Sequence, residues 1–176
     1  MKTIVDIKKI FYAPQMTTGT LTGSAIDVIL KSGTTKEIKN VHATTWTYEE
    51  AEPSVTDYLN QLNGKVYYRD STPGAVSVNF SIGQYDYQTK ADLQGGTATA
   101  TAWTRPETPG LVYKTLIAVT KDDTYIVFPK AIITARGGMV ESKLIALLLS
   151  AVAMDTGVDG LASEGWFDAS EIIPEA

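Results

Sequence analysis

The sequence predicts a mainly β (α+β) fold, in which two packed antiparallel β-sheets form a sandwich or a partly open barrel with one or two short helices. Short segments rich in β-branched and aromatic residues, several of them strictly alternating, recur along the chain. Gly, Pro and Asn-Gly turns separate these segments. The length of 176 residues suits one well-buried core, so we expect a single domain over residues 1–176.

The composition is that of a globular protein, with 44% hydrophobic and 20% charged residues, which excludes disordered and fibrous classes. Without cysteine, neither a disulfide framework nor a thiolate metal site can form. The net charge of −5 and the absence of a basic patch argue against direct nucleic-acid binding. The first residues lack the apolar core of a signal peptide. The longest apolar run, Leu144–Met154, has 11 residues, whereas a membrane helix needs about 20. We therefore expect a soluble, non-secreted protein.

The first element expected is a strand over Thr3–Tyr12, because apolar and polar residues alternate there before Pro14. The Thr- and Gly-rich stretch Gln15–Gly23 predicts a loop.

A short helix is predicted after this loop. Ser24 and Asp27 have the spacing of a capping box, with Asp in place of the usual Glu or Gln. Gly33 follows where a helix often ends. The helix would gather its apolar residues on one face: Ala25, Ile26, Ile29 and Leu30. The alternation of Ile26, Val28 and Leu30 would also fit a strand.

The segment Glu37–Tyr48 is predicted to be a strand from its β-branched and aromatic residues. An acidic loop then carries Glu49, Glu50 and Glu52 up to Pro53.

An extended hairpin arm is expected over residues 49–70. Two β-like runs, Ser54–Leu62 and Lys65–Asp70, are joined by Asn63-Gly64. Asn-Gly is the strongest short-range hairpin signal, because a type I′ turn needs positive φ at both central positions.

The next stretch predicts a strand and then a second helix. Ala75–Ile82 alternates strictly, which is typical of a strand with one buried face. Asp86 can cap a helix that runs to about Leu93 and ends at Gly95-Gly96.

The C-terminal half predicts further strands. Thr97–Trp103 alternates strictly. A second hairpin is predicted from two runs and the polar turn between them: Val112–Thr120, Lys121-Asp122-Asp123 and Thr124–Phe128. Pro129 is expected to interrupt the second run, and Lys130–Ala135 to continue as a strand up to Gly137-Gly138.

The segment Ser142–Met154 fits either a helix or a strand. Its Leu and Ala content favours a helix. The hairpins before it and the glycines after it, Gly157, Gly160 and Gly165, favour a strand.

Four stretches together carry a family resemblance. They are Ile7-Lys8-Lys9-Ile10-Phe11-Tyr12-Ala13-Pro14, residues 41–53 (VHATTWTYEEAEP), Leu116–Asp122 with Tyr125–Ala131, and Gly165-Trp166-Phe167-Asp168. They resemble the tail tube (major tail) proteins of bacteriophages and prophages. The resemblance runs over most of the chain and consists of strand patterns and turn positions rather than a ligand motif.

This resemblance implies two packed β-sheets with a flanking helix, and it favours a strand for Ser142–Met154. It implies a structural subunit and not an enzyme: six copies close into a ring, rings stack head to tail into a tube, and DNA passes through the bore without specific binding. The implied partners are further copies of the chain and other phage tail proteins, with no membrane partner. The implied locations are the virion tail and, during assembly, the cytoplasm of the bacterial host.

Within the resemblance, two segments are candidate stacking elements: the 49–70 arm and the C-terminal tail 168–176. Candidate inter-subunit contacts are Glu49, Glu50, Glu52, Asn63, Gly64 and Trp166.

No catalytic constellation, cofactor site or metal site is expected. His42 is the only histidine and occupies an ordinary strand-like position. Neither Gly95-Gly96 nor Gly137-Gly138 matches a phosphate-binding loop. An enzyme would have to depend on carboxylates such as Glu49 or Glu50, which are more typical of a solvated edge.

Two alternatives stay open. The chain could be the terminator or inner tube of a related injection machine. It could also be a small β-sandwich that binds a ligand or carbohydrate, which would need an apolar pocket with convergent polar groups.

Overall fold

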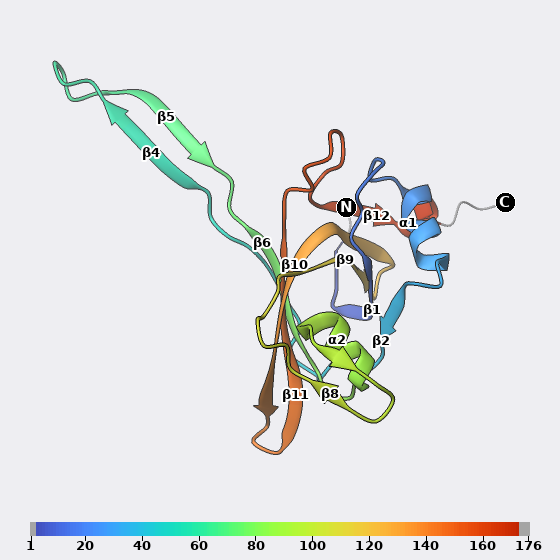
Figure 1. Ribbon diagram of the computed structural model, residues 1–176. Helices are drawn as coiled ribbons and strands as arrows, with labels where there is room; N and C mark the ends of the chain where they lie inside the picture. The colour runs from blue at the N-terminus through green and yellow to red at the C-terminus, as the bar shows by residue number, and fades with distance from the viewer. Residues whose placement is uncertain (1–2, 173–176) are drawn as a thin grey trace.

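The fold is mainly β and antiparallel, as the sequence predicts. The computed structural model describes residues 3–172 (Figure 1). One eight-stranded sheet has the order β2-β1-β9-β10-β11-β6-β3, with β12 also paired to β10, and two two-stranded sheets are formed by β4-β5 and β7-β8. The strands are β1 (Ile7–Pro14), β2 (Lys36–Ile38), β3 (Thr47–Glu50), β4 (Ser54–Leu59), β5 (Val66–Thr72), β6 (Val76–Ile82), β7 (Thr97–Ala98), β8 (Trp103–Thr104), β9 (Val112–Thr120), β10 (Thr124–Val140), β11 (Leu144–Ala153) and β12 (Gly165–Asp168). The helices are α1 (Gly23–Lys31), α2 (Tyr87–Gln94) and α3 (Ala169–Ile172).

The large sheet curls so far that the segment following β2 reaches β6, near the other edge of the sheet. β2 pairs with β1, and two residues after Ile38 the same chain segment reaches β6. There the His42 N–H donates to the Ser81 carbonyl at 2.7 Å, and the Gly83 N–H donates to the Asn40 carbonyl at 2.9 Å. Residues 36–42 therefore connect β1 with β6 and partly close the sheet into a barrel. The side chains on the inner face of the sheet then pack against one another.

Two apolar clusters lie on the two faces of this sheet. The inner cluster draws on six strands and on Leu93 of α2; its largest fully buried members are Phe80, Phe128, Ile10, Ile82, Leu93 and Leu147. The outer cluster places α1 and α3 against β9 and β10, through Ile26, Ile117, Val127 and Ile172. β9 and the first half of β10 are thus buried on both faces, which explains their nearly continuous apolar sequences.

Both predicted helices form, and a third, short helix was not predicted. α2 matches its prediction: the Asp86 carboxylate accepts a hydrogen bond from the Thr89 N–H at 2.6 Å, and Gly95 (φ +82°) follows its last residue. The predicted capping box of α1 is wrong. Thr22, not Ser24, caps the helix by accepting from the Ala25 N–H at 3.3 Å.

The predicted end of the β10 strand is also wrong. Pro129 does not interrupt β10, because a register shift between Phe128 and Ala131 absorbs it. The strand also runs past Gly137-Gly138 to Val140. A Cβ on Gly138 would lie 2.5 Å from Leu148 Cδ1, so this glycine permits close packing and does not form a turn.

The turn between β10 and β11 contains no glycine. Glu141 and Ser142 both have positive φ, +50° and +56°, as a type I′ turn requires. The ambiguous segment 142–154 is a strand from Leu144 to Ala153, as the resemblance implied.

Two other predicted strands are shorter than expected. The alternating segment Thr97–Trp103 folds back on itself, with the Thr99 N–H donating to the Ala102 carbonyl at 2.8 Å. Only β7 and β8 remain of it. The segment 37–48 is broken between β2 and β3, where Thr44 has φ +61°.

Gly23 sets how closely α3 packs on α1. A Cβ at this position would lie 1.9 Å from the Glu171 carbonyl oxygen. We expect Gly23→Ala to force the two helices apart and lower the free energy of unfolding by about 1–3 kcal/mol, measured by urea denaturation. Gly33→Ala is the matched control, since a Cβ there meets nothing within 4 Å. Equal stability of the two variants would contradict this packing.

Candidate assembly surfaces

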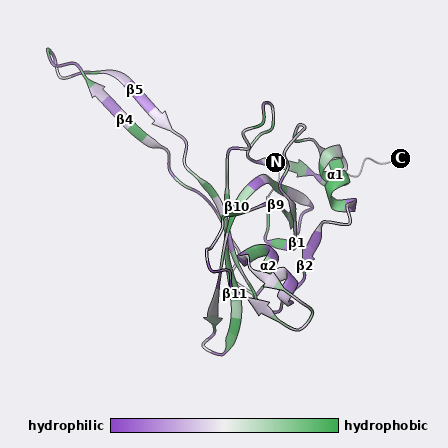
Figure 2. Ribbon diagram, viewed as in Figure 1, coloured by the Kyte–Doolittle hydropathy of each residue, from purple (hydrophilic) through white to green (hydrophobic). Residues whose placement is uncertain are grey.

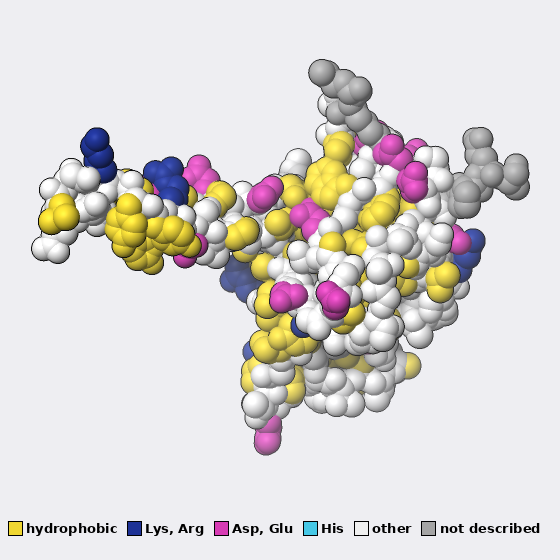
Figure 3. Space-filling view, turned by 90° about the horizontal axis from the view of Figure 1, so that it is seen from above, with side chains coloured by type: hydrophobic (Ala, Val, Ile, Leu, Met, Phe, Trp, Pro, Cys, Tyr) yellow, Lys and Arg dark blue, Asp and Glu magenta, His cyan; other side chains and the backbone are white. Residues whose placement is uncertain are grey.

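The β4-β5 hairpin is an arm that extends from the body of the molecule (Figure 1). Every residue of both strands is exposed. Apolar side chains nevertheless lie along its length (Figure 3): Val55, Tyr58, Leu59, Leu62, Val66, Tyr67 and Tyr68. A two-stranded hairpin is at best marginally stable in water by itself, and exposed apolar patches mark interaction sites. The arm therefore has the properties of a surface that a partner covers.

Cross-strand contacts hold the arm together on each face. On one face the Arg69 guanidinium donates to both carboxylate oxygens of Asp57, at 2.6 and 2.9 Å. This hydrogen-bonded pair lowers the pKa of Asp57 and raises that of Arg69. On the other face the Tyr58 and Tyr68 rings lie 5.6 Å apart. The arm is thus ordered by its own side chains, while its apolar surface stays open.

The tip of the arm is a longer turn than predicted. The Asn60 N–H donates to the Lys65 carbonyl, and the Gly64 N–H donates back to the Asn60 carbonyl, both at 2.8 Å. Gly64 has φ +66°, but Asn63 does not have positive φ. The prediction of a two-residue type I′ turn at Asn63-Gly64 is therefore wrong. The longer loop carries Leu62, which is 95% exposed.

The root of the arm is anchored on β6. Glu49 and Glu50 lie in β3, opposite Ser77 and Val76, and not in the loop that the sequence predicts. The Ala51 N–H continues this pairing by donating to the Ala75 carbonyl at 2.9 Å. All three predicted glutamates, Glu49, Glu50 and Glu52, are exposed.

Trp166 lies beside this root. Its indole N–H donates to Glu164 Oε1 at 2.6 Å, and the Tyr48 hydroxyl donates to the same oxygen at 2.9 Å. The two rings meet edge to face, with centroids 5.4 Å apart. Burial and the adjacent Glu164 carboxylate raise the pKa of Tyr48. Because Tyr48 precedes Glu49 in β3, the structure brings Trp166 and the acidic residues to one end of the arm, whereas Asn63-Gly64 lies at the other.

Sequence reasoning missed a second apolar projection, the β10-β11 hairpin. It points to the bottom of the view in Figure 1, whereas the arm points to the upper left. Met139 and Ile145 lie opposite each other near its tip and are 63% and 69% exposed. Figure 2 shows how apolar and polar residues are distributed over both projections. The pairing of Met139 with Ile145 could not be predicted from the sequence, because it requires residues 142–154 to form a strand and the sequence left their secondary structure open.

A hollow of about 540 Å³ opens between the start of β1, the end of β2 and residues 41–46. Its lining includes His42, whose Nε2 lies 3.4 Å from Glu141 Oε1 at the β10-β11 turn. His42 thus brings residues 41–46 into contact with the β10-β11 turn.

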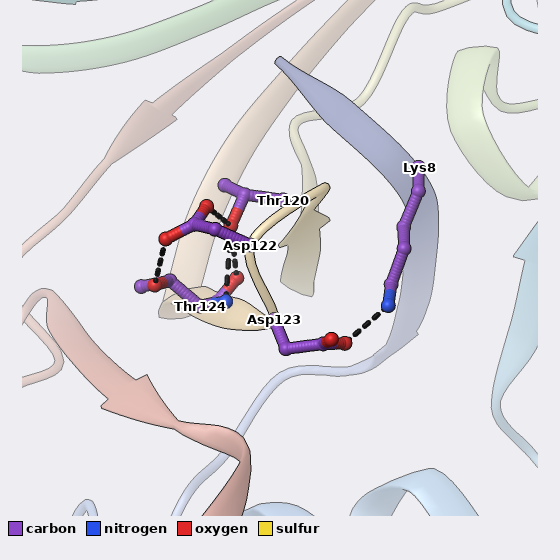
Figure 4. A network of polar contacts seen from close by, with 5 residues as sticks. All are labelled: Lys8, Thr120, Asp122, Asp123 and Thr124. Carbon is purple, nitrogen blue, oxygen red and sulfur yellow. Dashed lines mark hydrogen bonds and ion pairs between the residues drawn. The ribbon is translucent and has the colours of Figure 1, made fainter. Parts of the chain in front are cut away.

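The polar turn between β9 and β10 forms where the sequence predicts it (Figure 4). The Asp122 carboxylate accepts from the hydroxyls of Thr120 and Thr124, at 2.6 and 3.0 Å, and Asp123 pairs with Lys8. The hydrogen bond from Thr120 is the main cause of a lowered pKa at Asp122. These contacts fix the turn and tie it to β1.

Comparison of the sequence with protein-family models gives no match, and comparison with curated protein sequences gives none. Among residues 3–172, no helix has the length and apolar character needed to span a membrane.

Proposed function

We propose that the chain is a structural subunit that assembles with copies of itself, and that it forms a phage tail tube. The observation that carries the proposal is the arm: an ordered hairpin, exposed on both faces, with a row of apolar side chains and no cover within the described chain. Surface of this kind is typical of interaction sites. The family resemblance gives the assembly its form, rings of six copies stacked head to tail.

The placement of the two apolar projections supports a head-to-tail arrangement. The arm leaves the body toward the upper left of Figure 1 and the β10-β11 hairpin toward the bottom, so the two projections point in different directions. Contacts between different surfaces of identical copies close into rings or continue as open filaments. A tube of stacked rings combines the two kinds of contact: one closes each ring, and the other joins each ring to the next.

The charge also suits a conduit. With a net charge of −5 per copy, an assembled tube repels nucleic acid, so DNA passes through the bore without being held. The proposed partners are then other copies and other tail proteins. The proposed locations are the virion tail and, before it is complete, the cytoplasm of the bacterial host.

A second candidate is a ligand-binding module, which the 540 Å³ hollow favours. Its volume lies within the range of small-molecule sites. Its lining combines apolar side chains such as Ile10 and Ile38 with the three lysines Lys8, Lys9 and Lys39, which would suit a small organic anion.

Negative-stain microscopy of the purified protein over a range of concentrations tests the proposal. We expect rings with sixfold symmetry or stacked tubes. Single particles of the size of one chain at every concentration would count against self-assembly and move the ligand-binding module to first place.

A further inference from the structure

The hollow beside β1 has the chemistry of a docking site for an acidic, partly apolar segment. Apolar side chains, among them the fully buried Ile10, lie at its floor. Its lining also carries the cationic side chains Lys8, Lys9 and Lys39, the imidazole of His42 and one carboxylate, Asp6, which pairs with Lys121. This hollow lies at the open seam of the barrel, because β1 pairs with β2 only from Ile10 to Tyr12 and leaves residues 7–9 uncovered on that side.

Two of these cations have no ion-pair partner. Lys8 pairs with Asp123, and His42 approaches Glu141. Within the described chain, Lys9 and Lys39 are exposed and form no ion pair. The rim of the hollow therefore holds two uncompensated positive charges on a protein whose net charge is −5.

The root of the arm has the complementary composition. Residues 49–53 read Glu-Glu-Ala-Glu-Pro and are exposed throughout. None of the three glutamates forms an ion pair in the described part of the chain. Ala51 and Pro53 add apolar surface between and after the carboxylates.

These residues cannot fill the hollow of their own chain without unfolding the arm root. Glu49 and Glu50 are fixed opposite β6, and a Cβ on Gly74 would lie 1.7 Å from the Ala51 carbonyl oxygen. The root is therefore paired with β6 and packed closely against the returning segment of its own arm. A hollow that receives this root therefore belongs to another copy.

We propose that the acidic root of the arm, Glu49–Pro53, docks in the Lys9/Lys39 hollow of a second copy. The inference rests on the proposed self-assembly and identifies one pair of surfaces that makes it. Opposite charges across such an interface fix its register and speed association. The apolar floor of the hollow receives Ala51 and Pro53.

Two charge-reversed variants test the pairing. The first carries Lys9→Glu and Lys39→Glu, and the second carries Glu49→Lys, Glu50→Lys and Glu52→Lys. A matched control, Lys31→Glu with Arg105→Glu, changes the net charge as much as the first variant does, at exposed positions on α1 and next to β8. Thermal unfolding of each purified variant checks that it is folded.

Each reversed variant alone is expected to need at least about tenfold more protein for half-maximal assembly, measured by light scattering, than the wild type and the control. An equimolar mixture of the two is expected to assemble again, because the basic root of one variant then meets the acidic hollow of the other.

Assembly of either reversed variant at the wild-type concentration overturns the pairing, and so does a mixture that assembles no better than its components. If the wild type itself stays monomeric at all concentrations, the proposed self-assembly fails first, and this inference fails with it.

Discussion

Replacing arm residues 54–72 with a short Gly-Ser linker is expected to leave a folded monomer that no longer assembles. The arm is exposed over its whole length, and its two strands pair only with each other. The body therefore loses little when the arm is removed, and we expect the free energy of unfolding to change by less than about 0.5 kcal/mol. Assembly should be lost because the exposed apolar residues are the proposed contacts.

Urea denaturation and light scattering of the same preparation separate these two effects. A smaller deletion, residues 59–67, removes the tip with Leu59, Leu62 and Tyr67 and is expected to act in the same direction. Val28→Ser is a control that removes one exposed apolar residue on α1, 70% exposed, and should assemble normally. Tubes formed by the arm-deleted protein would refute the role of the arm.

Phe80→Ala is expected to destabilise the body by about 3–5 kcal/mol. Phe80 is 2% exposed in the inner cluster, and its ring lies 5.8 Å from that of Trp46. Removing it leaves a cavity inside the curled sheet, where strands on several sides are fixed by hydrogen bonds and cannot close the gap. The loss should appear as a lower urea midpoint with little change in slope.

Val28→Ala is the matched control for this truncation, because its side chain is largely in solvent, and it should cost less than about 0.5 kcal/mol. A cost below about 1 kcal/mol for Phe80→Ala would mean that the inner face of the sheet is not a packed core.

Those parts of the fold that depend on local patterns were predictable. The alternation in Ala75–Ile82 and the apolar run Val112–Thr120 gave β6 and β9 within one residue of their bounds. The cap at Asp86 placed α2. Each of these elements is determined by the residues of its own short segment.

The errors arose where a tertiary contact decides what a residue does. The pair Gly137-Gly138 predicts the end of a strand, yet Gly138 lies within β10, where Leu148 packs against its backbone. The real turn uses Glu141 and Ser142, which have no strong turn signal. Alternation at Thr97–Trp103 indicated a long strand, but the small residues permit a tight reversal.

The candidate surfaces were predictable to a similar degree. Acidic residues at the arm root and Trp166 were identified from the sequence, and the structure brings them to the same end of the arm through Tyr48. The Lys9/Lys39 hollow could not be foreseen. It exists only because residues 36–42 cross from β1 to β6, and no local pattern encodes that crossing.

The mass of the intact protein by light scattering, measured from low to high concentration, tests self-assembly most directly. We expect a mass that rises with concentration, in steps of six chains or as a continuous polymer. A mass equal to one chain across the whole range would contradict the account.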